Sequence, residues 1–129
     1  TCTAFAKSGK KVAAICAAPS VLASLGLLEG RNATAHAGFQ DQLAGAIVHD
    51  EEVVVDGNIT TSYGLGGAIP FALELVRQLA GQAEAERIRT EQGIVDMEEP
   101  AVCALLPAVC RTAWKTRRFY RRMGGRSGR

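Results

Sequence analysis

Residues 11–19 read KVAAICAAP, a short apolar run that ends at a cysteine and is followed by two alanines and a proline. The run from Lys11 to Ile15 is typical of a buried strand. The next stretch, Pro19–Leu28, carries apolar side chains at helical spacing and predicts a helix that Gly30 ends. Cys16 therefore falls on the turn between a strand and a helix.

A nucleophile on such a turn needs small neighbours two positions to either side, because the turn is sharp and strained. Ala14 and Ala18 satisfy that requirement. The N-terminus of the following helix would stabilise a thiolate, and the amide of Ala17 could help to hold an oxyanion. The alternative is that Cys16 is only a small buried side chain among alanines.

His36 is the candidate partner of that thiol. It follows a predicted strand at Ala33–Ala35, and if this strand neighbours Lys11–Ile15, its carboxyl end brings His36 to the same sheet edge as Cys16. An imidazole there could act as the acid or base partner of the thiol, whereas a histidine on an ordinary loop would have no such role.

His49 lies beside three acidic residues, which predicts a position on a solvated acidic surface. Neither histidine has metal-ligand spacing to a cysteine, so no metal site is expected. Glycines at positions 64, 66 and 67 match no complete phosphate-binding fingerprint. They predict a tight turn from a strand into a helix.

The rest of the first 95 residues alternates strands with helices. The pattern predicts a short helix before Gly9, a hairpin over Val53–Ser62 with Asp56-Gly57 as its turn, an amphipathic helix over Ile69–Ala80 and a polar helix over Gln82–Glu91. This order indicates an α/β layer architecture with a mainly parallel sheet that has too few strands to be complete.

The composition is that of a globular chain, with 47% hydrophobic and 22% charged residues among 129. No apolar run reaches the ~20 residues that a membrane-spanning helix needs, so a membrane protein is not expected. No signal peptide is visible at the N-terminus. The four cysteines form no C-x-x-C pair, which indicates a reducing, cytoplasmic setting.

The charges divide the chain into two parts. Residues 1–95 hold seven Lys/Arg against ten Asp/Glu, and residues 96–129 hold eight against three. This asymmetry is typical of a folded body followed by a basic tail, which leaves open an arm for nucleic acid or acidic membranes. The tail's composition and abrupt start favour a disordered extension instead, so neither partner is expected.

Four segments occur together in one order: KVAAICAAP, Ala35-His36, EEVVVDGNITTS over Glu51–Ser62, and IPFALEL over Ile69–Leu75. In this combination the chain resembles the C-terminal half of the ThiJ/PfpI family. The resemblance implies a flavodoxin-like (class I glutamine amidotransferase-like) three-layer α/β sandwich, incomplete because the family's N-terminal half is missing. It also implies a family part over residues 1–95 and a tail over 96–129, and we expect the chain to be a piece of a longer protein.

Members of this family are described as glyoxalases that convert methylglyoxal to lactate without a cofactor, as protein deglycases, and as oxidation-responsive chaperones. The resemblance therefore implies a homodimer that acts on a small aldehyde, or on a glycated protein or nucleotide. Cys16 matches the reactive cysteine of the family, His36 the nearby histidine, and Ala17 the residue whose amide helps to form the anion pocket. An oxidation sensor with chaperone-like activity and an inactive fragment are the alternatives.

The sequence departs from the family pattern in three places. Ala17 stands where the protease-like branch has a histidine, which disfavours a peptidase. Tyr63-Gly64-Leu65-Gly66 stands where the family commonly reads Arg-Gly-Pro-Gly. No residue matches the glutamate of the family's N-terminal half that hydrogen-bonds the reactive thiol.

Overall fold

The computed structural model describes residues 1–94, so the expected tail over 96–129 lies outside the described residues. The chain divides into two units, Thr1–Ile88, which is compact, and the residues from Arg89 onward. The elements that matter for the candidate site all belong to the first unit.

Helices and strands alternate along the chain. Their order is α1 (Cys2–Lys7), β1 (Val12–Ile15), α2 (Ala18–Ser24), β2 (Asn32–Ala33), the 3-10 helix η1 (Ala37–Gln42), β3 (Ile47–Val48), β4 (Val53–Asp56), β5 (Ile59–Ser62), the 3-10 helix η2 (Leu65–Gly67), α3 (Ala68–Ala80) and α4 (Gln82–Glu91). The predicted strand before Cys16 and the predicted helices before Gly9, over 69–80 and over 82–91 are confirmed.

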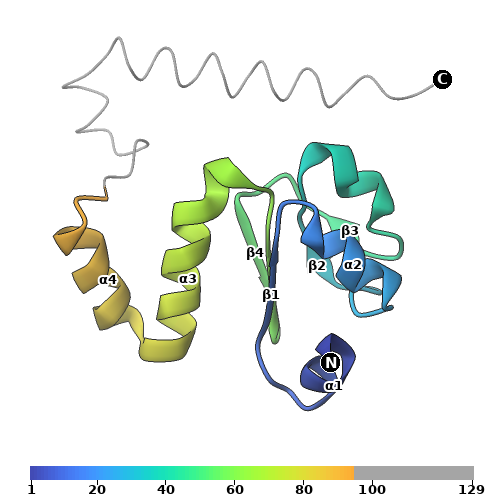
Figure 1. The fold of residues 1–129 in the computed structure, drawn as a ribbon, viewed down its shortest axis with the longest axis horizontal. Helices are drawn as coiled ribbons and strands as arrows, with labels where there is room; N and C mark the ends of the chain where they lie inside the picture. The colour runs from blue at the N-terminus through green and yellow to red at the C-terminus, as the bar shows by residue number, and fades with distance from the viewer. Residues whose placement is uncertain (95–129) are drawn as a thin grey trace, which may run out of the picture. The chain divides into compact units, whose positions relative to one another are not determined.

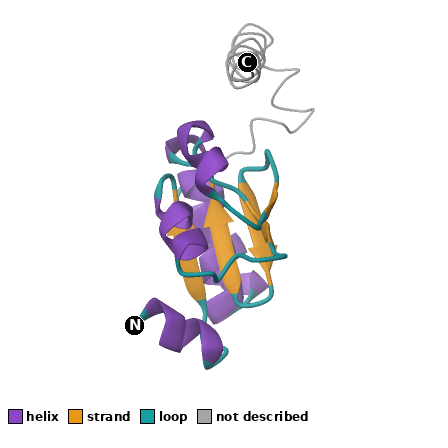
Figure 2. Ribbon diagram, turned by 90° about the vertical axis from the view of Figure 1, so that its right-hand side faces the viewer, coloured by secondary structure: helices purple, strands orange, loops and turns teal. Residues whose placement is uncertain are grey.

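The strands form two small sheets (Figure 2). In the larger one β5 lies between β1, to which it is parallel, and β4, to which it is antiparallel. In the smaller one β2 and β3 pair in parallel. The described sheet is therefore mixed, whereas the sequence predicted a mainly parallel one, because the β4–β5 hairpin contributes an antiparallel pair.

Helices cover both faces of the larger sheet, with α2 on one side, where η1 packs against it, and α3 on the other (Figure 1). The core lies on the α2 side and consists of small and aliphatic residues: Ala14, Leu22, Leu28, Ala33, Ala35, Leu43 and Ile59. On the other side α3 buries no residue completely, and Ile69 and Leu79 are 55% and 75% exposed. The two faces of the sheet are thus covered to very different degrees.

The first long helix ends earlier than predicted. We expected Pro19–Leu28, but α2 stops at Ser24 because Gly26 adopts a left-handed conformation, with φ 70°. The amide of Gly26 donates to the carbonyl of Ala23, and that of Leu27 donates to the carbonyl of Leu22. This pair of bonds is a Schellman motif, so Gly26 and not Gly30 is the C-terminal signal.

The hairpin is confirmed, but its turn is one residue further along than expected. Asp56 still pairs with Ile59, which leaves Gly57 and Asn58 as the two turn residues. Only Gly57 has a positive φ, of 60°, which is the pattern of a type II′ turn and not of type I′.

The three polar residues of β5 are completely buried, and each hydroxyl group bonds a different segment of the chain. Thr60 Oγ1 accepts from the side chain of Gln78 on α3, at 3.0 Å. Thr61 Oγ1 accepts from the amide of Thr34, at 3.0 Å, and Ser62 Oγ donates to the carbonyl of Gly67, at 3.5 Å. Because buried polar groups are costly when unpaired, these bonds fix where α3, the β2 segment and η2 meet the central strand.

A polar cluster closes the end of the sheet where β4 turns into β5. Asp56 Oδ2 accepts from the amide and the side chain of Asn32, at 2.8 and 3.0 Å, and Arg31 Nη1 lies 3.7 Å from Asp56 Oδ1. The hydrogen bonds from Asn32, and then the charge of Arg31, lower the pKa of Asp56 below its ordinary value of 3.8.

We expect Asp56→Ala to lower the free energy of unfolding by about 1 kcal/mol at neutral pH, because the lost bonds involve a charged but partly exposed acceptor. A carboxyl group with a lowered pKa stabilises the fold above its unfolded pKa, and this contribution is lost as the pH falls through the folded pKa. The free energies of unfolding of the variant and the wild type, measured by urea denaturation, should therefore become equal as the pH falls well below 3.8.

Asp41→Ala, at an exposed position of η1, serves as the control and should change stability much less. If the difference in free energy of unfolding between Asp56→Ala and the wild type stays constant from neutral pH to a pH well below 3.8, the lowered pKa of Asp56 does not contribute to stability.

Candidate active site

The backbone at Cys16 is strained. Cys16 lies between the end of β1 and the start of α2, and its φ of 64° makes it the only non-glycine residue with positive φ among residues 1–94. That conformation costs on the order of 1–3 kcal/mol for such a residue, and it is the geometry of a nucleophile elbow. Two backbone bonds hold it: Cys16 donates to the carbonyl of Ser62 at 3.0 Å, and its own carbonyl accepts from His36 at 2.9 Å.

The second of those bonds brings His36 to the elbow. The predicted strand at Ala33–Ala35 is shorter and earlier, since β2 spans Asn32–Ala33 and pairs with β3, not with β1. The buried bond from Thr34 to Thr61 nevertheless ties this segment to the central strand two residues before the histidine. Cys16 and His36 therefore meet as predicted, although the strand pairing that we expected to bring them together is wrong.

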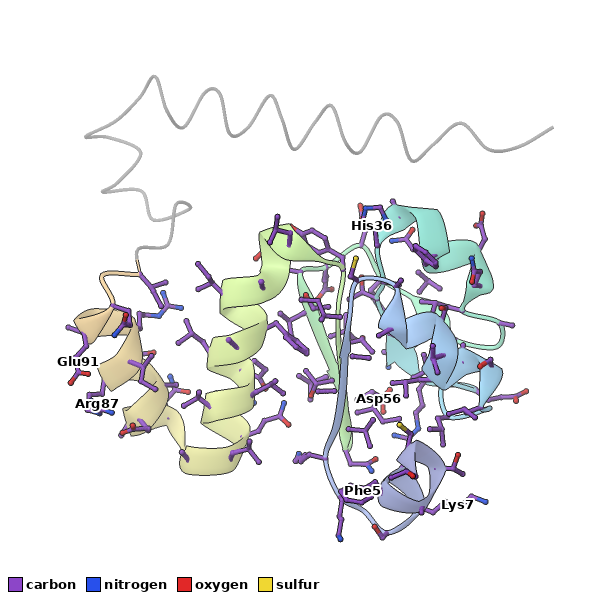
Figure 3. The ribbon with its side chains drawn as sticks, in the orientation of Figure 1. Phe5, Lys7, His36, Asp56, Arg87 and Glu91 are labelled. Atoms are coloured by element: carbon purple, nitrogen blue, oxygen red, sulfur yellow. The ribbon has the colours of Figure 1, made fainter. Side chains whose placement is uncertain are left out.

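The ring of His36 is fixed in orientation. Its Nδ1 accepts a hydrogen bond from the amide of Gly38, at 3.2 Å, and so caps the N-terminus of η1. In the neutral ring the proton is then on Nε2, which leaves that atom as a donor. Phe39 packs edge-on against the imidazole, with ring centroids 6.4 Å apart. Figure 3 shows His36 at the end of the sheet opposite to Asp56.

Gly64 lies beside both the thiol of Cys16 and the imidazole of His36. A Cβ atom built on Gly64 would be 3.8 Å from Cys16 Sγ and 3.7 Å from His36 Cδ2. Both side chains therefore border the same small space, although Cys16 comes from β1 and His36 from the segment after β2. Both residues are also exposed to solvent, so a small molecule can reach them.

Ala17, the predicted backbone donor, follows the elbow directly. Its amide has no hydrogen-bond partner within residues 1–94, whereas its carbonyl accepts from both the amide and the hydroxyl group of Ser20. An unpaired N–H next to a thiol is the kind of group that can stabilise a developing oxyanion.

The other candidates from the sequence lie elsewhere or serve the fold. His49 is half-buried, and its Nε2 lies 2.7 Å from Asn32 Oδ1, in the polar cluster with Asp56. The glycines before α3 form the tight turn that was expected. A Cβ on Gly67 would come within 2.7 Å of Ser62 Oγ and 2.9 Å of the Glu52 carbonyl, so close packing requires glycine there.

Sequence reasoning missed Thr61, Ser62 and Gly64 as residues that build the site. The available signal was the Thr-Thr-Ser run inside a predicted strand, since three consecutive polar residues do not alternate as a half-buried strand would. A buried strand of that kind needs partners for its hydroxyl groups. Here the partners are Thr34, two residues before His36, and Gly67, on the turn that contains Gly64.

Within the described part of the chain, no group of three or more His, Cys, Asp or Glu residues is arranged to hold a metal ion. Cys2 and Cys16 are both free, exposed thiols. Among the helices of residues 1–94, none is long and apolar enough to cross a membrane.

Two curated relatives illustrate what this chain is similar to. It is 42% identical over 82 residues to "Protein dj-1beta" of Drosophila melanogaster, which covers 62% of this chain and 44% of that protein. It is 42% identical over 73 residues to "Deglycase PfpI" of Pyrococcus furiosus, which covers 55% of this chain and 44% of that protein. The chain thus spans less than half the length of these relatives.

Solved structures agree with the fold. The crystal structure of Drosophila melanogaster DJ-1beta superposes with a TM-score of 0.67 at 34% identity, over 73% of this chain and 52% of that one. The α/β fold class predicted from the sequence is therefore confirmed. The family model described as the DJ-1/PfpI family matches residues 1–78, which is more than half of the chain. The chain belongs to the DJ-1/PfpI family.

Proposed function

We propose that this chain carries the thiol and the imidazole of a cofactor-independent glyoxalase or deglycase, which acts on methylglyoxal or on the equivalent glycated groups. The observation that carries the proposal is the space at Gly64, bordered by Cys16 Sγ and by the ring of His36. The name of the Pyrococcus furiosus relative, a deglycase, supports the same class of substrate.

The first step is addition of a thiolate to an aldehyde. The sulfur of Cys16 forms a bond to the aldehyde carbon, and the π electrons of the C=O bond move to oxygen. His36 Nε2–H is the donor available to that developing alkoxide, since Nδ1 is occupied by the amide of Gly38. The amide of Ala17, which has no hydrogen-bond partner within residues 1–94, is a second donor. The product is a hemithioacetal.

The second step is an internal redox reaction. The proton on the former aldehyde carbon leaves, and another is added at the neighbouring ketone carbon, so the aldehyde carbon is oxidised as the ketone carbon is reduced. The result is a thioester of a 2-hydroxy acid, which water hydrolyses to lactate and free thiol. No external oxidant or reductant is consumed. In the family resemblance, a carboxyl group carries the proton between the two carbons, and it belongs to the half that this chain does not match.

The proposal predicts that Cys16→Ser abolishes methylglyoxal consumption, because a hydroxyl group is a far weaker nucleophile than a thiolate at neutral pH. Cys2→Ser is the matched control, since Cys2 is also a free, exposed thiol but lies on α1. Lactate formation by each variant, followed by an enzymatic lactate assay, is the measurement. Turnover by Cys16→Ser at the wild-type rate would overturn the proposal.

A pair of substitutions separates the two contributions of His36. Asparagine can accept the Gly38 amide as a helix cap but lacks the donor that Nε2 provides, and alanine lacks both. We expect both variants to lose on the order of 10²-fold or more in kcat/KM. Only His36→Ala should also lower the free energy of unfolding, by roughly 1 kcal/mol, because only that variant loses the cap. If His36→Asn keeps wild-type activity, His36 is only a cap.

One observation favours the second candidate function, an oxidation sensor: Cys16 is exposed on a strained elbow. Peroxide oxidises a thiolate to a sulfenate with release of water, and a second equivalent gives the sulfinate. For a sensor we expect peptide mass mapping to show Cys16 oxidised at least about tenfold faster than Cys2, since selectivity follows thiolate character as well as exposure. Equal oxidation of the two cysteines with persistent aldehyde turnover would exclude the sensor and leave the enzyme.

A further inference from the structure

We propose that Gly64 is a specificity-determining residue, whose missing side chain leaves room beside the thiol for an aldehyde of two or three carbons. The proposal deepens the proposed function and rests on it in one respect, that Cys16 is the nucleophile. It concerns a residue from the opposite side of the site, on the turn that joins β5 to η2.

The backbone explains why this position holds glycine. Gly64 has φ 148° and ψ −155°, a region that residues with a side chain essentially never occupy. It cannot shift easily, because its carbonyl accepts from the amide of Gly67 at 2.9 Å and because Ser62, two residues before it, holds the elbow. The bare Cα of Gly64 is therefore held against the thiol.

The size of the space follows from the distances. The Cβ of an alanine at position 64 would lie 3.8 Å from Sγ of Cys16, 4.0 Å from its Cβ and 3.7 Å from Cδ2 of His36. These are ordinary contact distances, so a methyl group would fit there in contact with both side chains and overlap neither. In the native chain that position beside the thiol stays open to a substrate.

Such a space matters because bond formation requires a close approach. A carbonyl carbon must come within about 3–3.5 Å of the sulfur before it reacts. A methyl group on residue 64 would occupy one side of that approach and would collide first with substrates that carry a bulky group next to the aldehyde. The missing side chain of Gly64 thus lets the site admit a bulkier group beside the aldehyde than a residue with a side chain would.

The test compares the full chain with Gly64→Ala and with a control that introduces the same kind of backbone strain away from the site. Gly81→Ala is that control, since Gly81 has φ 96° and no atom lies within 4 Å of an added Cβ. Two readouts are used. One is kcat/KM for glyoxal, methylglyoxal and phenylglyoxal, and the other is the alkylation rate of Cys16 by iodoacetamide and by N-ethylmaleimide, followed by peptide mass mapping.

We expect Gly64→Ala to lose on the order of 10-fold to 100-fold in kcat/KM, with the loss increasing from glyoxal to phenylglyoxal. Alkylation of Cys16 should slow in the same order, more for the maleimide than for iodoacetamide. Gly81→Ala should lose comparable thermal stability, but its kcat/KM values for the three aldehydes and its alkylation rates at Cys16 should match those of the wild type. If Gly64→Ala and Gly81→Ala show the same dependence on substrate size and reagent size, the proposal is overturned.

The two readouts separate this proposal from the proposed function. If the wild type turns over none of the aldehydes, the glyoxalase assignment fails, yet the size-graded alkylation still tests Gly64. If Gly64→Ala does not fold, the wild type alone decides: Cys16 should discriminate against the maleimide more strongly than Cys2 does in the same chain. If Cys16 and Cys2 show the same ratio of maleimide to iodoacetamide alkylation rates, the space beside Cys16 does not restrict the size of a reagent.

Discussion

The structure depends on a central strand that is buried and polar at the same time. Thr60, Thr61 and Ser62 of β5 are shielded from water, so each hydroxyl group must find a partner inside the protein. The partners come from three separate parts of the chain: α3, the segment before His36 and the η2 turn. An apolar strand would pack against these segments with some tolerance in position, whereas directional bonds specify where each one sits.

The same strand accounts for the strained cysteine. Cys16 is held in a left-handed conformation by one bond from its amide to Ser62 and another from its carbonyl to His36. The unfavourable conformation persists because the surroundings over-determine it, as is common at functional sites. The elbow and the histidine are thus coupled through the backbone, since the bond that supports one also places the other.

The sequence was informative where local rules dominate. The apolar run ending at Cys16, the hairpin and the helix ending at Gly81 follow from periodicity and turn chemistry. The meeting of Cys16 with His36 was predicted from a pairing of their two strands, whereas a backbone hydrogen bond between the two residues is what brings them together. The sequence was less informative about where helices end and which strands pair. Gly26 ends α2, although the sequence predicted Gly30, and β2 pairs with β3, although the sequence predicted a pairing with β1. Which glycine adopts a left-handed conformation and which strand finds which partner depend on long-range packing. For the same reason Gly64 looked like an ordinary turn residue, because its importance comes from two side chains distant in sequence.

The placement of the Asp56 cluster has a consequence for how this domain can change. Asp56 and His36 lie at opposite ends of the sheet (Figure 3), and the bonds of the two clusters share no residue. Effects of substitutions at sites that are far apart and share no partner usually add. One end of the domain can therefore lose or gain stability while the geometry at the other end stays the same. A lineage, or an engineer, can raise the thermal tolerance at the hairpin without altering what happens at the thiol.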